Sequence, residues 1–114
     1  MPRYSLIVMT NPVPGREAEY NDWYTNVHLP DVLRIPGVVS AQRFSKSEIQ
    51  RDAGPHPWDY LAIYECETDD PTTIVAELKA RSGTAAMPIS NSLGKGDRLV
   101  CFFEPITETV TAAD

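Results

Sequence analysis

The stretch NDWYTNVHLPDVLRIPG, residues 21–37, joins residue types that are found this close together in no other part of the 114-residue chain. It holds an aromatic pair, Trp23-Tyr24, and then a histidine, an aspartate and two prolines. Residues 16–29 have the spacing of an amphipathic helix, which places four apolar side chains within an arc of about 100°. The arc comprises Tyr20, Trp23, Tyr24 and Val27.

His28 lies at the border of this arc, about 40° beyond Tyr24. Pro30 follows shortly afterwards, and proline lacks a backbone donor and disfavours helical geometry at the residue before it. We therefore expect an interruption at Pro30, a short turn on a new axis over residues 31–33, and an end to the unit at Pro36-Gly37.

The rest of the chain supplies four strands and a second helix. Apolar or alternating runs predict strands at residues 4–10, 38–46, 58–65 and 98–103. In the second of these, Val39, Ala41 and Arg43 are expected on one face. Asp70-Pro71 is a typical helix start and Gly83 a typical stop. Residues 48–57 and 84–96 are predicted to be loops.

The order strand, helix, strand, strand, helix, strand predicts an α+β, ferredoxin-like βαββαβ sandwich. Two helices would cover one face of a four-stranded antiparallel sheet, in a single domain over residues 1–114. Residues 6–9 and 99–103 are apolar at consecutive positions, so the other sheet face is apolar as well. We expect a second copy of the chain to cover it, which would make a homodimer through the sheet face.

Composition narrows the class of partner. Sixteen acidic against ten basic residues leave a net charge of −6, which argues against nucleic acids and anionic membranes. No apolar run approaches the ~20 residues that span a bilayer, and the N-terminus lacks the long apolar region of a signal peptide. Cys66 and Cys101 sit in strand-like runs and are expected to be buried, reduced thiols. The chain is predicted to be cytoplasmic.

Three short motifs together resemble the first helix and second strand of EthD-like proteins. They are Trp23-Tyr24, the step His28-Leu29-Pro30, and Pro36-Gly37 leading into a strand. The resemblance implies the dimeric α+β barrel superfamily. That superfamily includes cofactor-free decarboxylases, dehydratases, isomerases and polyketide cyclases, as well as haem-degrading and cofactor-free monooxygenases and members without a known reaction.

His28 is the first candidate for chemistry, because imidazole exchanges protons near neutral pH. It also matches the histidine of the EthD-like motif. A histidine at a helix end can instead bind a backbone carbonyl or stabilise the helix terminus. Asp31, three residues later, could orient the imidazole or raise its pKa, or could cap the turn after Pro30.

The other predicted site residues are aromatic or cationic. Tyr64 is a candidate catalytic phenol, with Tyr24, Tyr60 and Trp23 as substrate-binding walls, although each could be a core residue. Arg43 could clamp a carboxylate or form an edge-strand ion pair. The histidines and cysteines lack paired metal-ligand spacing, so no metal site and no cofactor are predicted. Haem would have His28 as its one reasonable axial ligand.

These residues favour a cofactor-independent lyase or isomerase acting on a small aromatic, polyketide-like or lactone substrate. His28 would be the general acid/base in a decarboxylation, dehydration, cyclisation or isomerisation. One alternative is a haem-degrading or cofactor-free monooxygenase. Another is a non-catalytic accessory protein that binds a small ligand.

Overall fold

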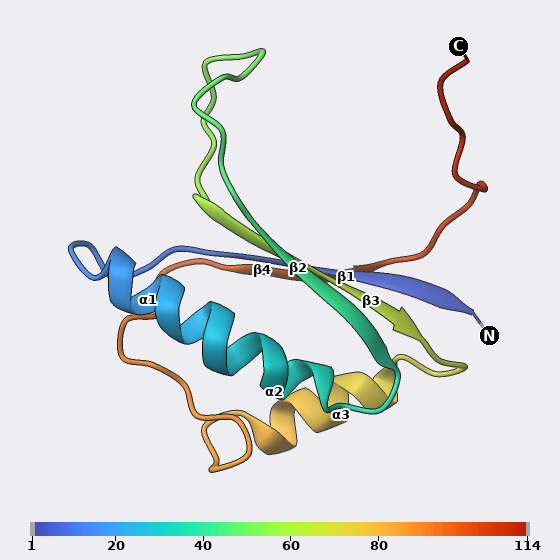
Figure 1. The fold of residues 1–114 in the computed structure, drawn as a ribbon, viewed down its shortest axis with the longest axis horizontal. Helices are drawn as coiled ribbons and strands as arrows, with labels where there is room; N and C mark the ends of the chain where they lie inside the picture. The colour runs from blue at the N-terminus through green and yellow to red at the C-terminus, as the bar shows by residue number, and fades with distance from the viewer. Residues whose placement is uncertain (1, 114) are drawn as a thin grey trace.

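A computed structural model describes residues 2–113, and its topology is the predicted ferredoxin-like one. The strands form one antiparallel sheet in the order β2-β3-β1-β4, and the helices lie on one of its faces (Figure 1). The elements in chain order are β1 Arg3–Thr10, α1 Glu17–Trp23, η1 Tyr24–His28, α2 Leu29–Leu33, β2 Val38–Ser45, β3 Tyr60–Glu67, α3 Thr72–Arg81 and β4 Leu99–Phe103.

The predicted helix interruption at Pro30 is wrong. Elements α1, η1 and α2 follow one another without a break, and Figure 1 shows them as one helix. η1 is a π-helical turn, in which the N–H of Leu29 donates to the carbonyl of Tyr24 five residues earlier. This wider turn leaves room for the proline ring, which would otherwise clash with the carbonyl four residues before it. Leu29 keeps helical backbone angles, with φ −56° and ψ −50°.

The π turn also changes which side chains face the sheet. Val27, predicted to dock the helix, is 36% exposed, whereas Tyr24 and Val32 are buried. An extra residue in the turn rotates every later position relative to α-helical spacing. Val27 is thereby moved outward, and His28 is moved from the border of the apolar face towards the sheet.

The predicted alternation along β2 fails at its first residues. A β-bulge lies between Val38 and Ser40, so Val38 pairs with Cys66 and is buried, while Val39 is 54% exposed. The extra residue of a bulge reverses the side-chain alternation on one side of it. Beyond the bulge, Ala41 and Arg43 share one face, as predicted, and their neighbours Tyr64 and Ala62 place that face towards the helices.

The core lies between the helices and the sheet. Gly37, at φ +100°, turns the chain from α2 into β2 and packs against Ile74 of α3. Asp70 accepts a hydrogen bond from the Thr72 N–H at 3.0 Å, which supports the predicted helix start. The largest fully buried side chains are Tyr20, Tyr64, Leu6, Ile35, Ile74 and Met87.

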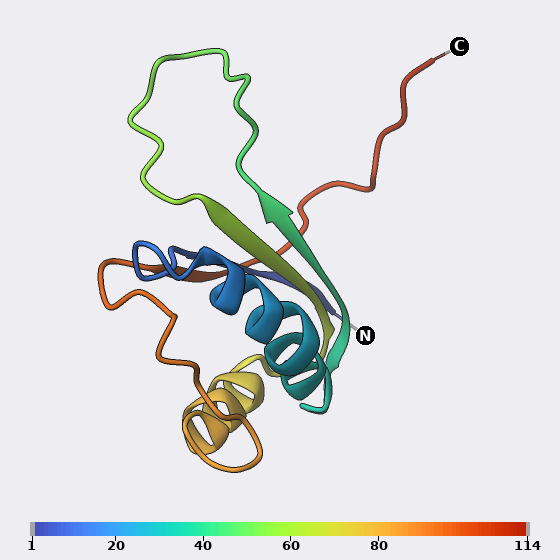
Figure 2. The same cartoon turned by 60° about the vertical axis from the view of Figure 1, so that its left-hand side comes forward.

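The other sheet face carries no helix (Figure 2). Its middle and one end are apolar, and Ser5 and Glu65 make the other end polar. Across its strands, Ile7 stands beside Ile63 and Cys101, and Met9 stands beside Leu61 and Leu99. Phe103, on the same face, is 55% exposed. We call this surface the outer sheet face. Cys101 is therefore half-buried, in contrast to the fully buried Cys66, and both thiols are free.

The loops are largely as predicted. The strand predicted from residue 58 begins at Tyr60. Trp58 lies in the preceding loop, and its indole N–H donates to the carbonyl of Asp97 at 2.8 Å. Residues 46–59 extend beyond the sheet as a loop between β2 and β3 (Figure 2). Within residues 2–113, no helix is long and apolar enough to cross a membrane.

Candidate active site

A cavity of about 590 Å³ lies between the helices and the covered face of the sheet. Its volume is within the usual range for small-molecule sites. The sheet contributes alternate side chains of β1 and β4, and the helices and the loop after α3 close the other sides. The apolar walls include Leu6, Val8, Phe102, Val32, Leu78 and Met87.

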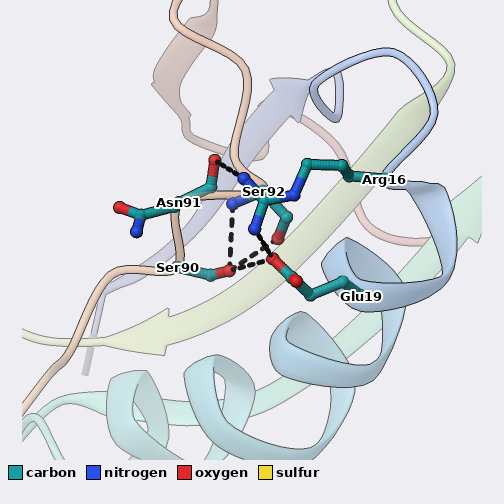
Figure 3. Close-up of polar contacts among 5 residues, drawn as sticks. All are labelled: Arg16, Glu19, Ser90, Asn91 and Ser92. Atoms are coloured by element: carbon teal, nitrogen blue, oxygen red, sulfur yellow. Dashed lines mark hydrogen bonds and ion pairs between the residues drawn. The ribbon is translucent and has the colours of Figure 1, made fainter.

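The loop that closes one side of the cavity, residues 84–96, is hydrogen-bonded to the start of α1 (Figure 3). Arg16 donates to the carbonyl of Asn91 at 3.2 Å, and the Ser90 hydroxyl donates to Glu19 at 3.4 Å. Arg16 also pairs with Glu19, and its hydrogen bond holds the pKa of that carboxyl below the ordinary value. The indole N–H of Trp23 donates to the backbone of the same loop at 3.1 Å. These bonds fix the loop wall relative to the helix that carries His28.

His28 lines this cavity, at the C-terminal end of the π turn. Its ring packs against Trp23 at a centroid distance of 4.8 Å and meets the edge of Tyr24 at 4.9 Å. Burial lowers the pKa of His28 to about 4, because the apolar surroundings disfavour the imidazolium. The Asp31 carboxylate acts in the opposite direction, and the Arg43 charge lowers the pKa slightly further. The imidazole is therefore neutral at physiological pH.

The two ring nitrogens of His28 have different surroundings. Nδ1 is buried and has no hydrogen-bond partner within residues 2–113, and the same is true of Oδ2 of Asp31. Nε2 is the nitrogen left to meet a ligand in the cavity. Asp31 lies one helical turn after His28 but does not line the cavity, and its Oδ1 accepts a 2.5 Å bond from Arg34. A ring nitrogen of His28 and a carboxylate oxygen of Asp31 are thus both buried without a hydrogen-bond partner.

Two tyrosines bring hydroxyl groups to the same cavity. The Tyr64 hydroxyl donates to the hydroxyl of Tyr24 at 3.4 Å, and both rings are buried. Burial raises the pKa of Tyr24 to about 12, and burial raises the pKa of Tyr64 as well. Both phenols therefore stay protonated. Because the Tyr64 proton is donated to Tyr24, the Tyr24 hydroxyl is the one that can donate a hydrogen bond to a carbonyl or phenolate oxygen.

Tyr60 and Arg43 do not line the cavity. The Arg43 guanidinium lies over the Tyr24 ring, 4.5 Å from its centroid, and donates to Asn21 at 2.9 Å. The Tyr60 hydroxyl accepts a bond from the Asn21 amide at 3.2 Å. These residues form a cation–π and hydrogen-bond contact between α1 and the sheet. The edge-strand ion pair considered for Arg43 is replaced by this contact.

The structure thus brings together four of the seven predicted site residues: His28, Tyr64, Tyr24 and Trp23. Sequence reasoning missed two cations that also line the cavity, Lys79 and Arg98. Arg98 precedes Val100 and Phe102 at alternate positions, so strand periodicity could have placed it on this face. Within residues 2–113, no group of three or more His, Cys, Asp or Glu side chains could hold a metal ion.

Comparison with known proteins establishes the fold of the chain and leaves its activity open. No known family model matches the sequence. Core atranone cluster protein 1 of Stachybotrys chlorohalonatus is 32% identical over 94 residues, or 80% of this chain, but the chain spans only 35% of that protein's length. An EthD-like protein from Ralstonia eutropha superposes with a TM-score of 0.67 at 12% identity, covering 96% of each chain.

A haem-degrading protein from Mycobacterium tuberculosis, MhuD, has the same fold. It superposes with a TM-score of 0.62 at 14% identity, over 94% of this chain and 99% of the other, and holds two haems in its active site. At these identities the likeness establishes the fold. The resemblance to EthD-like proteins found in the sequence is confirmed at that level.

Proposed function

We propose that this chain, which has the fold of the EthD-like proteins, is a cofactor-independent enzyme that removes a proton from a small aromatic or polyketide-like substrate. The observation that carries the proposal is the neutral, partly buried imidazole of His28, which lines an apolar cavity beside two protonated phenols. Strongly perturbed ionisable groups in an enclosed cavity are typical of catalytic sites.

Different residues of the cavity would have different roles in this proton removal. Nε2 of His28 would accept the proton, and the Tyr24 hydroxyl would donate a hydrogen bond to the enolate or phenolate oxygen that forms. The Tyr64 hydroxyl, which donates to the Tyr24 hydroxyl, would strengthen that bond. The unpaired Oδ2 of Asp31 would accept the Nδ1–H as the imidazolium develops, which would hold the ring in place. Proton return to another atom would give an isomerisation, and loss of a leaving group would give a lyase reaction.

The experiment is deuterium exchange at the acidic C1–H of 2-tetralone in D₂O, followed by proton NMR. The wild-type chain should exchange this position faster than buffer alone. His28→Ala should lower the enzymatic exchange rate by a factor of about 10² to 10⁴, which is the usual contribution of a general base. Tyr64→Phe should slow exchange less, and His56→Ala, which alters an exposed loop histidine, should exchange like the wild type. Binding without any exchange would instead indicate an accessory ligand-binding protein.

A monooxygenase is the second candidate, and it is supported by the haem degrader among the proteins of the same fold. A carbanion made by His28 could react with O₂ directly. Anthrone is a suitable probe, because one anthrone and one O₂ give one anthraquinone and one water. Oxygen uptake that matches anthraquinone formation and is lost in His28→Ala would favour oxygenation. Exchange of 2-tetralone without oxygen uptake on anthrone would favour the lyase or isomerase.

Haem is the cofactor that this second candidate could use. The unprotonated imidazole of His28 is a suitable iron ligand, and Lys79 and Arg98 are suitable partners for propionates. Bound haem would supply the activation of O₂. A Soret band on titration with hemin, absent in His28→Ala, would support this version, and an unchanged hemin spectrum would count against it.

We further propose that two copies pair through the outer sheet face. The cross-strand set Ile7, Ile63 and Cys101 continues into Met9, Leu61 and Leu99, and Phe103 on the same face is 55% exposed. An apolar face of this extent is unusual on a monomer. A second copy of the same face is the simplest cover, because two-fold pairing brings a surface onto itself.

A further inference from the structure

The cavity has a charge opposite in sign to that of the chain. Its ionisable lining consists of two permanent cations, Lys79 and Arg98, and three groups that are neutral at physiological pH, His28, Tyr24 and Tyr64. Among residues 2–113, no aspartate or glutamate lines it. The whole chain carries 16 acids against 10 bases. The local charge of the cavity is therefore opposite in sign to the net charge of the chain.

Neither cation forms an ion pair with another residue of the described range 2–113. By contrast, Arg81 nearby in α3 pairs with Glu77 at 2.8 Å. Both side chains are exposed and yet line the cavity, so they stand at its opening. A lysine in the last turn of a helix also complements the helix dipole, and this gives a structural reason for a lysine at position 79. Arg98 precedes β4 and has no such structural reason.

We propose that the ligand of this cavity is an aromatic acid, whose apolar body fills the cavity and whose carboxylate is bound at the opening by Arg98 and Lys79. The inference rests on the proposed function and names the substrate class of the same site. A guanidinium matches the two oxygens of a carboxylate, and an ammonium adds a mobile point charge. The ring would pack against the sheet floor and Trp23.

A bound carboxylate would also help His28. The cavity holds no negative charge of its own, and burial keeps the imidazole neutral. An anion in the cavity favours the imidazolium and raises the pKa of His28 towards the range in which a general base is effective. The acid group of the substrate would thus support the base that acts on it.

Isothermal titration calorimetry with 2-naphthoate and 2-naphthamide tests the inference, because the two probes share a ring system and differ in charge. The wild-type chain should bind naphthoate at least tenfold more tightly than naphthamide. Arg98→Gln and Lys79→Gln should each weaken naphthoate binding about threefold to tenfold and leave naphthamide binding unchanged. Lys95→Gln removes the same unit of charge outside the cavity and should bind both probes like the wild type.

The following results would overturn the inference. Equal affinity for the two probes, or a naphthoate preference that survives both cation substitutions, would overturn the inference and leave the proposed function standing. An equal loss in Lys95→Gln would show a general charge effect and would also overturn it. Failure of the folded wild-type chain to bind either probe would overturn the proposal that the cavity takes aromatic ligands, and the inference with it. Far-UV circular dichroism establishes that each variant is folded.

Discussion

The partly buried imidazole of His28 predicts a specific dependence of stability on pH, which the variant His28→Asn should remove. The folded pKa of about 4 lies below the ordinary value of 6.5, so the unfolded chain binds more protons between these two values. Stability from this residue is therefore complete above pH 6.5 and is lost as the pH falls towards 4. At roughly 1.4 kcal/mol for each pKa unit, the loss at pH 4 is about 3 kcal/mol.

Urea unfolding followed by far-UV circular dichroism, at pH 7.5 and at pH 4, measures this loss. His28→Asn has a fixed packing cost, but that cost is the same at both pH values and cancels in the difference. The wild-type chain should lose about 3 kcal/mol more than His28→Asn between the two pH values. His56→Asn, which removes the exposed loop histidine, should behave like the wild type. Equal losses in the wild type and His28→Asn would refute an imidazole that the folded chain keeps neutral.

Two further predictions concern the loop wall and the outer sheet face. Gly94→Ala should lower the free energy of unfolding by about 1–3 kcal/mol, because its Cβ would stand 2.5 Å from the carbonyl oxygen of Asn11. Gly96→Ala, whose Cβ meets nothing within 4 Å, is the matched control for thermal melting and should be close to neutral. Ile63→Lys should elute in light-scattering chromatography at the 12.7 kDa chain mass, and the wild type at twice that mass. Ile49→Lys, in a loop and 87% exposed, should remain paired, and a monomeric wild type would contradict the proposed dimer.

The topology was predictable because it depends on the order and period of apolar residues, which local sequence displays directly. The alternating run around Tyr60 to Tyr64 and the cap at Asp70 both lie where the sequence indicates. The errors at Pro30 and at the start of β2 arise from one inserted residue each. The π turn before Pro30 and the bulge at Val39 both shift the phase of a regular element, and periodicity assumes a constant phase.

The candidate site was predictable only in part, for a related reason. Trp23, Tyr24 and His28 are neighbours on one helix, so their proximity is local, and Tyr64 reaches them through simple strand alternation. Arg43 lies on the correct sheet face, but its guanidinium is drawn onto the Tyr24 ring from outside the cavity. Lys79 reaches the cavity only through the tertiary packing of α3, which no local pattern encodes.

The measurement that tests the central claim most directly is the pH profile of kcat/KM for deuterium exchange of 2-tetralone. This quantity reports the pKa of the catalytic base in the free enzyme. If Nε2 of His28 is the base, kcat/KM should stay level from pH 8 down to about pH 5 and then fall with a pKa of about 4. A fall centred near 6.5, or a profile that His28→Ala leaves unchanged, would contradict the account.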